Sequence, residues 1–417
     1  MGITADTGDD SLCTASAPTR KHRLMHKLDS SKDIMRGFNP AWFTATMGTG
    51  ITGVLFYGFP YESAAIRYIS MAIALFNAVL FTVFTVLLVG RSLVYRDFFK
   101  IMLHPQLSMP LGAIPMGLCT VINSLVSMLH PYHPRWLPTF TLVLWCIDVV
   151  ISVLSCLSVP FLMTTHHKHA LKTMNSTWIL PVVPTVVAAA SGAVVASIHS
   201  EPTANVIIIV SYVLWAIGVG IAMMMLTIYL LRMSLYKLPP KEAIVSSFIP
   251  LGPLGQSSYG IQQLGIQALR VFPTTLPAIP YIGEFMHCFG FATGLLIWGL
   301  GGWWFAHAIY SVLYTRSHGR LPFNLGWWAF IFPIGTFTSS TSSLWSMTGF
   351  TFFRVLAAIQ IAGILALWVY VMAQTIWFGW SGELFKPISL AAPRSHPEET
   401  LQPEKTPVGQ QAPMSQV

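Results

Sequence analysis

Charged residues are scarce in this sequence of 417 residues: they make up 9% of it, while 54% of the residues are hydrophobic. A soluble domain carries about 25% charged residues, so a folded chain of this composition does not present its surface to water. The formal net charge of +8 is compatible with nucleic-acid binding. The basic residues lie in short clusters between apolar segments, however, so we expect a lipid bilayer and no nucleic acid as partner.

Cysteine is also rare, with five residues and none of them in a CxxC pair. The chain therefore offers no disulfide framework. His166, His167 and His169 resemble a metal-binding tract, but the short loop lacks acidic or cysteine partners, and we expect no metal there. A phosphate-binding loop of the GxxxxGK type does not occur either, and we expect no cofactor.

Ten apolar runs account for most of the chain, and each is long enough to cross a bilayer as a helix of about 20 residues. In lipid every backbone group must pair internally, so the runs are expected to be helices and not strands. We therefore predict an all-α polytopic membrane protein with ten transmembrane helices. The runs lie at residues 40–58, 64–90, 109–129, 138–163, 178–198, 204–231, 245–269, 285–313, 325–348 and 351–378.

Polar segments flank the predicted membrane domain, which spans residues 36–380. Residues 1–35 and 381–417 cannot bury a core and are expected to be disordered tails. If the N-terminus is cytosolic, 19 Lys and Arg residues face the cytosol and 4 face the other side. This imbalance predicts that both termini are cytosolic, because basic residues concentrate on that side of a membrane.

The odd-numbered runs share a character that the even-numbered runs lack. They read WFTATMGTGITG from Trp42, MPLGAIPMG from Met109, WILPVVPTVVAAASG from Trp178, IPLGPLGQSSYG from Ile249 and WWAFIFPIGTFTSSTSS from Trp327. Proline inside a helix removes a hydrogen bond and kinks it, and small residues let helices approach closely. We predict five quasi-repeated hairpins around a central pore, with the odd helices inside and the smoother even helices against lipid.

Two of these segments resemble the tellurite-resistance/dicarboxylate transporter family. FNPAWFTATMGTGI from Phe38 is similar to the opening of that family, and WWAFIFPIGTF at 327–337 is similar to its ninth helix. The family includes plant slow anion channels, fungal malate permeases and fungal sulfite efflux pumps. The combination of FNPAWFTATMGTGI, WILPVVPTVVAAASG from Trp178 and SSFIPLGPLGQSSYGIQQLG from Ser246 most resembles the sulfite efflux pumps.

The resemblance implies a homotrimer in the plasma membrane, with ten helices in five hairpins around a pore for sulfite, a small inorganic anion. It also implies that a phenylalanine of the ninth helix occludes this pore. By position in WWAFIFP this gate would be Phe332, with Phe330 as the second choice. Both could instead be ordinary packing rings.

The anion pathway is expected to be neutral, because no lysine lies inside a predicted span and Arg270 and Arg354 sit at helix ends. Hydroxyls, broken helices and helix N-termini are then the available ligands. The candidate pathway residues are Thr46, Gly48, Thr49, Gly50, Pro115, Gly117, Pro184, Ser191, Gly192, Pro253, Gly255, Ser257, Ser258, Pro333, Gly335, Thr338, Ser339 and Ser342.

Asp148 is the one acidic residue deep in a predicted span. An intramembrane carboxyl group is a candidate for proton coupling. Because the fourth run belongs to the predicted outer ring, the alternative of a protonated or paired structural residue is favoured.

Two other functions remain open on the same sequence. A malate or other dicarboxylate permease would benefit from basic residues in the pore, which the odd runs lack. An intramembrane enzyme would need clustered acids, histidines or a metal, and Asp148 has no polar partner near it in sequence. We therefore expect no enzymatic activity.

Overall fold

The computed structural model describes residues 35, 37–61, 63–132, 134–381 and 384. The described part of the chain is helical and contains no strand. Except for Met35, Ser381 and Leu384, the two expected tails lie outside the described residues. The helices are α2 (Phe43–Tyr57), α3 (Ala64–Tyr95), α4 (Phe98–Leu103), α5 (Ala113–Leu129), α6 (Leu137–Thr165), α7 (Val183–Ala196), α8 (Glu201–Tyr236), α9 (Leu251–Thr275), α10 (Ile282–Ser317), α11 (Trp328–Thr348) and α12 (Thr351–Trp380).

Six helical segments are long and apolar enough to cross a membrane, so the chain is a polytopic membrane protein. They are the segment Met109–Tyr132, which contains α5, and the helices α3, α6, α8, α10 and α12. Each of the ten predicted runs coincides over most of its length with one α-helix, and several helices, such as α8 and α10, extend past the run. The helices α2, α7, α9 and α11 are not in this set, because each is either shorter or richer in polar residues.

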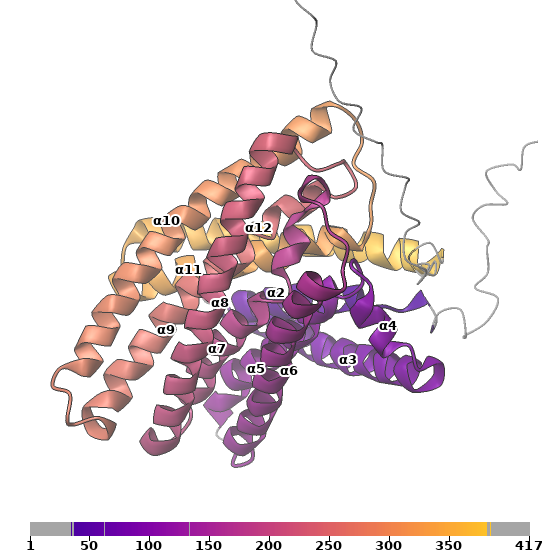
Figure 1. Ribbon diagram of the computed structural model, residues 1–417. Helices are drawn as coiled ribbons and strands as arrows, with labels where there is room; N and C mark the ends of the chain where they lie inside the picture. Colours follow the sequence, from indigo (N-terminus) through magenta and orange to yellow (C-terminus); the bar gives the residue numbers. More distant parts are fainter. Residues whose placement is uncertain (1–34, 36, 62, 133, 382–383, 385–417) are drawn as a thin grey trace, which may run out of the picture.

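The helices divide into an inner and an outer set (Figure 1). In the most apolar stretch of the α5 segment, 72% of the residues are buried. In the corresponding stretches of α3, α6, α8, α10 and α12, only 17–33% of the residues are buried. The inner helices form a closed ring, in which α2 contacts α5, α5 contacts α7, α7 contacts α9, α9 contacts α11, and α11 returns to α2. Each outer helix packs on two neighbouring inner ones, as α3 does on α2 and α5.

A 3-10 helix precedes each inner helix. These are η2 (Pro40–Trp42), η3 (Met109–Gly112), η6 (Ser176–Ile179), η7 (Ile244–Phe248) and η8 (Leu325–Trp327). In three of them an asparagine caps the turn by accepting a hydrogen bond from the backbone N–H two residues on. The caps are Asn39, Asn175 and Asn324, and each is followed three residues later by a tryptophan.

The prolines of the inner helices mostly do not kink them, which corrects the expectation from sequence. Pro184 lies in the first turn of α7, and Pro115 and Pro253 are the third residues of α5 and α9. In the first turn the missing N–H has no intrahelical partner, so proline is tolerated there. Pro333 does lie inside α11, but the outer helix α6 also carries an internal proline, Pro160.

Glycine allows a close approach in the ring between α9 and α11. A Cβ atom built on Gly255 would lie 2.3 Å from the backbone nitrogen of Phe337 and 2.6 Å from its Cα atom. Backbone atoms cannot move aside as a flexible side chain can, so the two helices would have to separate.

Gly255→Ala should therefore destabilise the protein at the upper end of the 1–3 kcal/mol that is typical of overpacking, or by more. The measurement is the thermal unfolding midpoint of the purified protein in detergent. Gly299→Ala is the matched control, because Gly299 lies in α10 with nothing within 4 Å of its would-be Cβ. Equal midpoints for the two variants would contradict the proposed tight contact.

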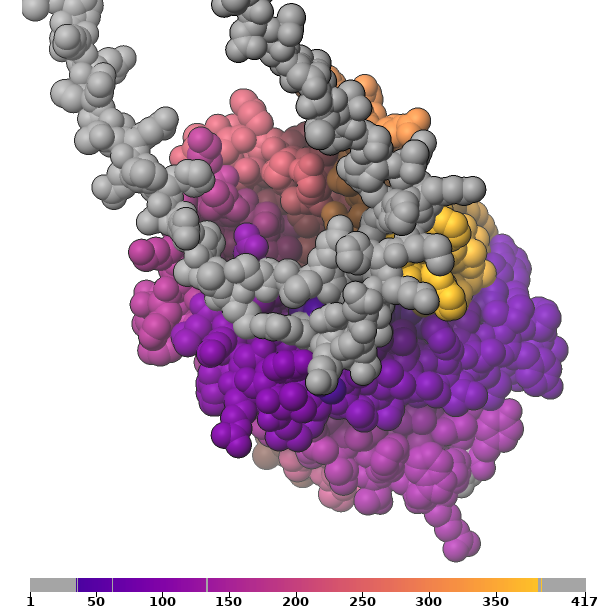
Figure 2. All heavy atoms as spheres, turned by 90° about the vertical axis from the view of Figure 1, so that its right-hand side faces the viewer, coloured from indigo at the N-terminus to yellow at the C-terminus, as the bar shows by residue number. Residues whose placement is uncertain are grey.

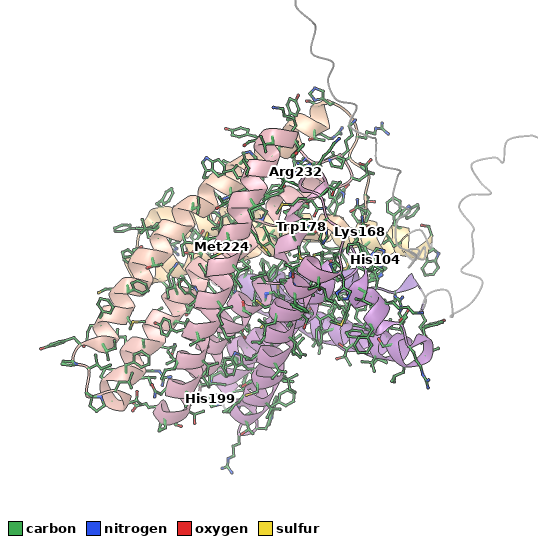
Figure 3. The ribbon with its side chains drawn as sticks, viewed as in Figure 1. His104, Lys168, Trp178, His199, Met224 and Arg232 are labelled. Atoms are coloured by element: carbon green, nitrogen blue, oxygen red, sulfur yellow. The ribbon has the colours of Figure 1, made fainter. Side chains whose placement is uncertain are left out.

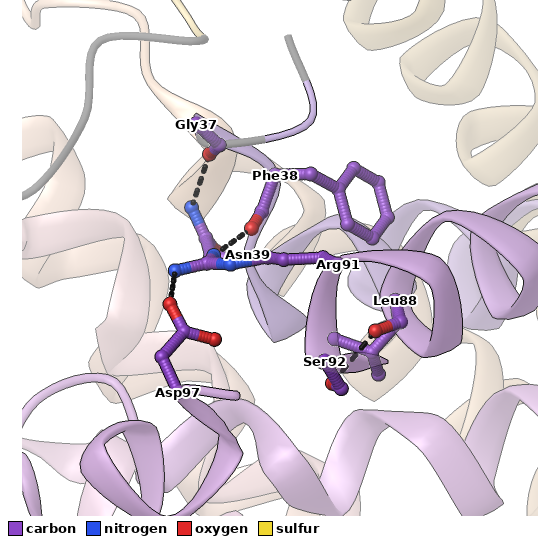
Figure 4. Close-up of polar contacts among 7 residues, drawn as sticks. All are labelled: Gly37, Phe38, Asn39, Leu88, Arg91, Ser92 and Asp97. Carbon is purple, nitrogen blue, oxygen red and sulfur yellow. Dashed lines mark hydrogen bonds and ion pairs between the residues drawn. The ribbon is translucent and has the colours of Figure 1, made fainter. Parts of the chain in front are cut away.

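A buried ion pair fixes the entrance to α2 (Figure 4). Arg91 near the end of α3 donates to Asp97 Oδ2 at 2.9 Å and to the backbone oxygen of Phe38. Both charged residues are buried, and they form the one ion pair among the described residues. The pair therefore joins the loop after α3 to the extended segment before η2.

Candidate functional site

A small cavity lies where the first turns of the inner helices meet. Its volume is about 40 Å³. All five inner helices, or the residues just before them, contribute to its lining, so it lies on the axis of the ring. We call this end of the ring the proximal end and the opposite end the distal end. The lining residues are Thr44, Met47, Met116, Leu180, Val183, Ile249, Gly252, Pro253, Trp328, Ala329, Phe332 and Pro333.

The cavity is almost wholly apolar and small. One water molecule occupies about 30 Å³ of liquid, so there is room for few waters and none for a hydrated anion. Thr44 carries the one hydroxyl group of the lining, and it donates to Ala41 O at 2.6 Å. Apolar constrictions of this kind gate channels by excluding water, so the axis is closed at this level.

The two candidate gate residues lie in different places. Phe332 lines the axial cavity and is 3% exposed. Phe330 instead packs against Phe248, with ring centroids 4.8 Å apart, in a cluster to the side of the cavity. Of the two, only the position of Phe332 suits a gate on the axis.

Beyond the cavity, the middle of every inner helix is fully packed. All residues of 45–53, 115–120, 181–193, 251–258 and 335–341 are buried. The closed region therefore extends over several helical turns past Phe332.

Half-buried residues reappear toward the distal end, and each of the five inner helices supplies at least one. They are Val54, Asn123, Val194, Tyr259, Gln263 and Ser342. Because these positions lie six to eleven residues beyond the last cavity-lining residue of the same helix, we interpret them as facing a distal vestibule on the axis.

The vestibule carries neutral polar groups. Ser191 donates to Asn123 Oδ1 at 2.8 Å, which leaves the amide N–H groups of Asn123 for another partner. Gln263 donates to Ser343 Oγ at 3.0 Å. The Ser342 hydroxyl oxygen is buried and has no partner among the described residues. These groups can donate hydrogen bonds to an anion without a fixed positive charge. Sequence reasoning found Ser191 and Ser342 but missed Asn123, Tyr259 and Gln263.

Most of the other candidate hydroxyls are engaged within the ring. Thr46, Ser257, Thr338 and Ser339 each donate to a carbonyl three or four residues earlier in their own helix. Ser258 donates to Gly294 O in α10 at 2.6 Å. Such local bonds are common for helical Ser and Thr, and they leave only lone pairs for a further ligand.

The candidate glycines lie at contacts between helices. Adding a Cβ would bring Gly48 against Trp328, Gly50 against Thr120, Gly117 against Thr46, Gly192 against Ser211, and Gly335 against Ile51. Thr49 similarly faces outward and accepts a hydrogen bond from Trp368 in α12. Of the prolines, Pro253 and Pro333 line the axial cavity, while Pro115 and Pro184 are buried in α5 and α7 without lining it.

Asp148 is fully buried between α6 and α5. Its Oδ2 atom accepts a hydrogen bond from Cys119 Sγ at 2.9 Å and a longer one from Ser152 at 3.4 Å. Among the described residues nothing lies within hydrogen-bonding distance of Oδ1. An ionised carboxylate with so little compensation would be costly, which favours a neutral carboxylic acid.

The basic and histidine residues noted in the sequence lie away from the axial cavity. Arg270 donates to Ala196 O at 2.7 Å, and Arg354 donates to Pro60 O at 3.2 Å, both at distal helix ends. At the other end the His169 ring packs at a tilt against Trp178, with ring centroids 4.4 Å apart, and lies edge-on to His167. Figure 3 labels Trp178 and His104 at this end of the molecule. Burial lowers the pKa of His167 and of His169, so both are neutral at pH 7.

Comparison with known proteins identifies the family. Residues 37–376 match the profile of the family described as voltage-dependent anion channel. The chain is 40% identical to a sulfite efflux pump of Arthroderma benhamiae over 84% of this chain and 92% of that protein. A sulfite efflux pump of Trichophyton rubrum is similar to the same extent.

A more distant relative is a malic acid transport protein of Schizosaccharomyces pombe, 23% identical over 81% of this chain and 77% of that protein. The family match covers all ten long helices except the last four residues of α12. It confirms the resemblance inferred from the segments at Phe38 and Trp327. The chain therefore belongs to the voltage-dependent anion channel family.

Proposed function

We propose that this protein exports sulfite across the plasma membrane and that it does so as a passive conduit along the axis of the inner ring. The observation that carries the proposal is the closed ring of five helices, with an apolar cavity at one end and neutral hydrogen-bond donors at the other. The 40% identity to proteins named sulfite efflux pumps supports sulfite as the substrate. The family match favours transport over catalysis, and the absence of a phosphate-binding loop from the sequence favours a conduit that does not use ATP.

We further propose that all ten long helices cross the membrane as five hairpins around the pore. The ring contacts support this arrangement, because α2, α7, α9 and α11 are enclosed by the outer helices and need not be apolar toward lipid. The proximal end is then cytosolic, since 10 of the 14 Lys and Arg residues that the structure describes lie at it. A homotrimer would cover part of the apolar surface of the outer helices.

The electrical field would drive export without a second energy source. Each negative charge that leaves a cytosol held 100 mV negative gains about 2.3 kcal/mol, and a doubly charged sulfite gains about twice as much. Neutral ligands suit this task, because they compensate for part of the lost hydration and still release the ion. In this scheme Phe332 would open the path, and Asn123 and Ser342 would receive the anion beyond the packed region.

Efflux from proteoliposomes tests the proposal. Vesicles that contain the purified protein are loaded with sulfite or malate, and release is followed under an imposed membrane potential with the proton gradient held fixed. We expect rapid, voltage-driven sulfite release and little malate release. Malate release that equals or exceeds that of sulfite would instead assign the protein to the dicarboxylate permeases, for which the distant malic acid relative is the present argument.

Asp148→Asn should leave voltage-driven sulfite release unchanged. The amide keeps the shape of the side chain and cannot carry a proton, so a structural residue tolerates the change while a proton carrier does not. The measurement is sulfite release driven by voltage alone and by a proton gradient alone, with Ser152→Ala as a control for disturbed packing around Asp148. Proton-driven release that the Asn variant loses and the control keeps would assign coupling to Asp148.

A further inference from the structure

A groove with a volume of about 670 Å³ lies between the ends of α8 and α10. Both helices pack on α9, and they end at the same end of the molecule (Figures 1 and 2). The groove opens between them there, at the proximal end. Its walls are apolar, with Leu230 and Met233 on one side and Tyr314 on the other. Leu230 and Tyr314 are exposed on helix faces that the membrane would cover.

Basic groups line the rim of the same groove. Lys237 and Lys241 lie on the loop after α8, and His318 lies at the end of α10. The Lys241 ammonium group donates to His318 O at 2.7 Å, which holds the two sides together and leaves two of its three N–H bonds for a ligand. Glu242 follows Lys241 in the sequence, but it does not line the groove.

The rim is positioned by buried contacts. Arg232, buried near the end of α8, donates to Lys237 O at 2.6 Å and to Lys172 O at 3.0 Å. These bonds fix the backbone at Lys237, which has the positive φ of 64° that breaks the helix and turns the chain back across the groove. The lysines are thereby held at the boundary between the apolar walls and the polar end of the molecule.

We propose that this groove binds an anionic phospholipid from the leaflet at the proximal end. Like the groove, a phospholipid has an apolar part and a charged part. Its acyl chains can pack against Leu230, Met233 and Tyr314, and its phosphate group can pair with Lys237 and Lys241. Basic pockets between transmembrane helices are suited to anionic head groups, and each basic side chain near such a surface raises affinity about fivefold. A free inorganic anion would use the lysines alone and would leave the apolar walls uncovered.

One segment of the chain contributes to both the groove and the axial cavity. The segment that begins at Lys241 continues through η7 to Ile249, which lines the cavity beside Phe332. A lipid held by Lys241 therefore acts on a segment that forms part of the cavity lining.

Photolabelling tests the site independently of transport. The purified full-length protein is placed in phosphatidylcholine nanodiscs that contain a trace of phosphatidylserine with a photoactivatable acyl chain, and labelled peptides are identified by mass spectrometry. We expect labelling concentrated on the ends of α8 and α10. Unlabelled phosphatidylserine should displace the probe, while phosphatidylcholine and millimolar inorganic phosphate or sulfite should not.

Lys237→Gln with Lys241→Gln should reduce labelling of the groove by roughly 25-fold, from about fivefold for each lysine. The matched control is Lys168→Gln with Lys172→Gln, which removes the same charge from exposed lysines at the same end and should leave labelling unchanged. Labelling spread evenly over all outer helices, or equally reduced in both double variants, would overturn the site. Displacement by inorganic phosphate would also overturn it, in favour of a simple anion site.

Discussion

Phe332→Ala should increase sulfite release several-fold, to about tenfold if the ring accounts for 1.4 kcal/mol of the barrier. The phenylalanine side chain lines an axial cavity of about 40 Å³, which is too small for a hydrated anion. Removing the ring enlarges the apolar cavity on the axis and allows water to enter with the ion. The measurement is sulfite efflux from proteoliposomes at a fixed membrane potential, normalised to the amount of protein inserted.

Phe330→Ala is the matched control, because Phe330 is two residues away on the same helix but packs against Phe248 to the side of the cavity. It should lose stability by about 3–5 kcal/mol, as buried aromatic truncations do, without any gain in efflux. Phe332→Leu should lie between the wild type and Phe332→Ala. If both alanine variants increased efflux equally, general loosening of α11 would explain the effect and Phe332 would not be a gate.

Asp97→Ala should destabilise the protein by about 3–5 kcal/mol, the usual effect of leaving one partner of a buried ion pair without the other. The Arg91 guanidinium would keep its bond to Phe38 O but lose its only carboxylate, at a site from which water is excluded. The measurement is the thermal unfolding midpoint in detergent, together with the fraction of protein that elutes as a single species.

A double variant separates the charge from the side-chain volume. Arg91→Met with Asp97→Leu removes both charges and should recover much of the lost stability, because a buried pair is often replaceable by apolar residues. Lys100→Gln, an exposed change on the neighbouring helix α4, should have no effect. A normal midpoint for Asp97→Ala would show that the pair does not secure the start of α2.

The helices and their division into two sets could be predicted from local sequence. The length and apolarity of the runs predicted the positions of the ten helices. Small residues such as Gly255 and Gly335 indicated which helices lie inside the bundle. Pro333 lies inside α11, where the proline argument applies, but the argument was wrong for Pro184, because proline near a helix start has no hydrogen bond to break. The caps at Asn39, Asn175 and Asn324 show a repeat of Asn-x-x-Trp that was legible in the sequence and was overlooked.

The site was only partly predictable, because exposure within a bundle depends on neighbours that are distant in sequence. Phe332 was found through its family position, and its place on the axis depends on four other helices. Asn123 was missed because it lies in an apolar run with no proline or glycine beside it. A signal did exist on α9, where the polar residues Tyr259 and Gln263 are four positions apart and therefore share a face.

The closed ring of inner helices also bears on how the protein is made. α2 is among the first helices to leave the ribosome, yet two of the helices it packs against, α11 and α12, are among the last. Gly48 of α2 contacts Trp328 of α11 in the folded protein. At a translation rate of about 5–20 residues per second, Trp328 is synthesised tens of seconds after Gly48. During that interval the polar face of an unfinished ring is open to the bilayer. Biogenesis of this protein therefore requires that the first hairpins be shielded from the bilayer until the last hairpin is inserted. Mutations at the contact between α2 and α11 should impair insertion more than mutations at contacts between helices that are neighbours in sequence.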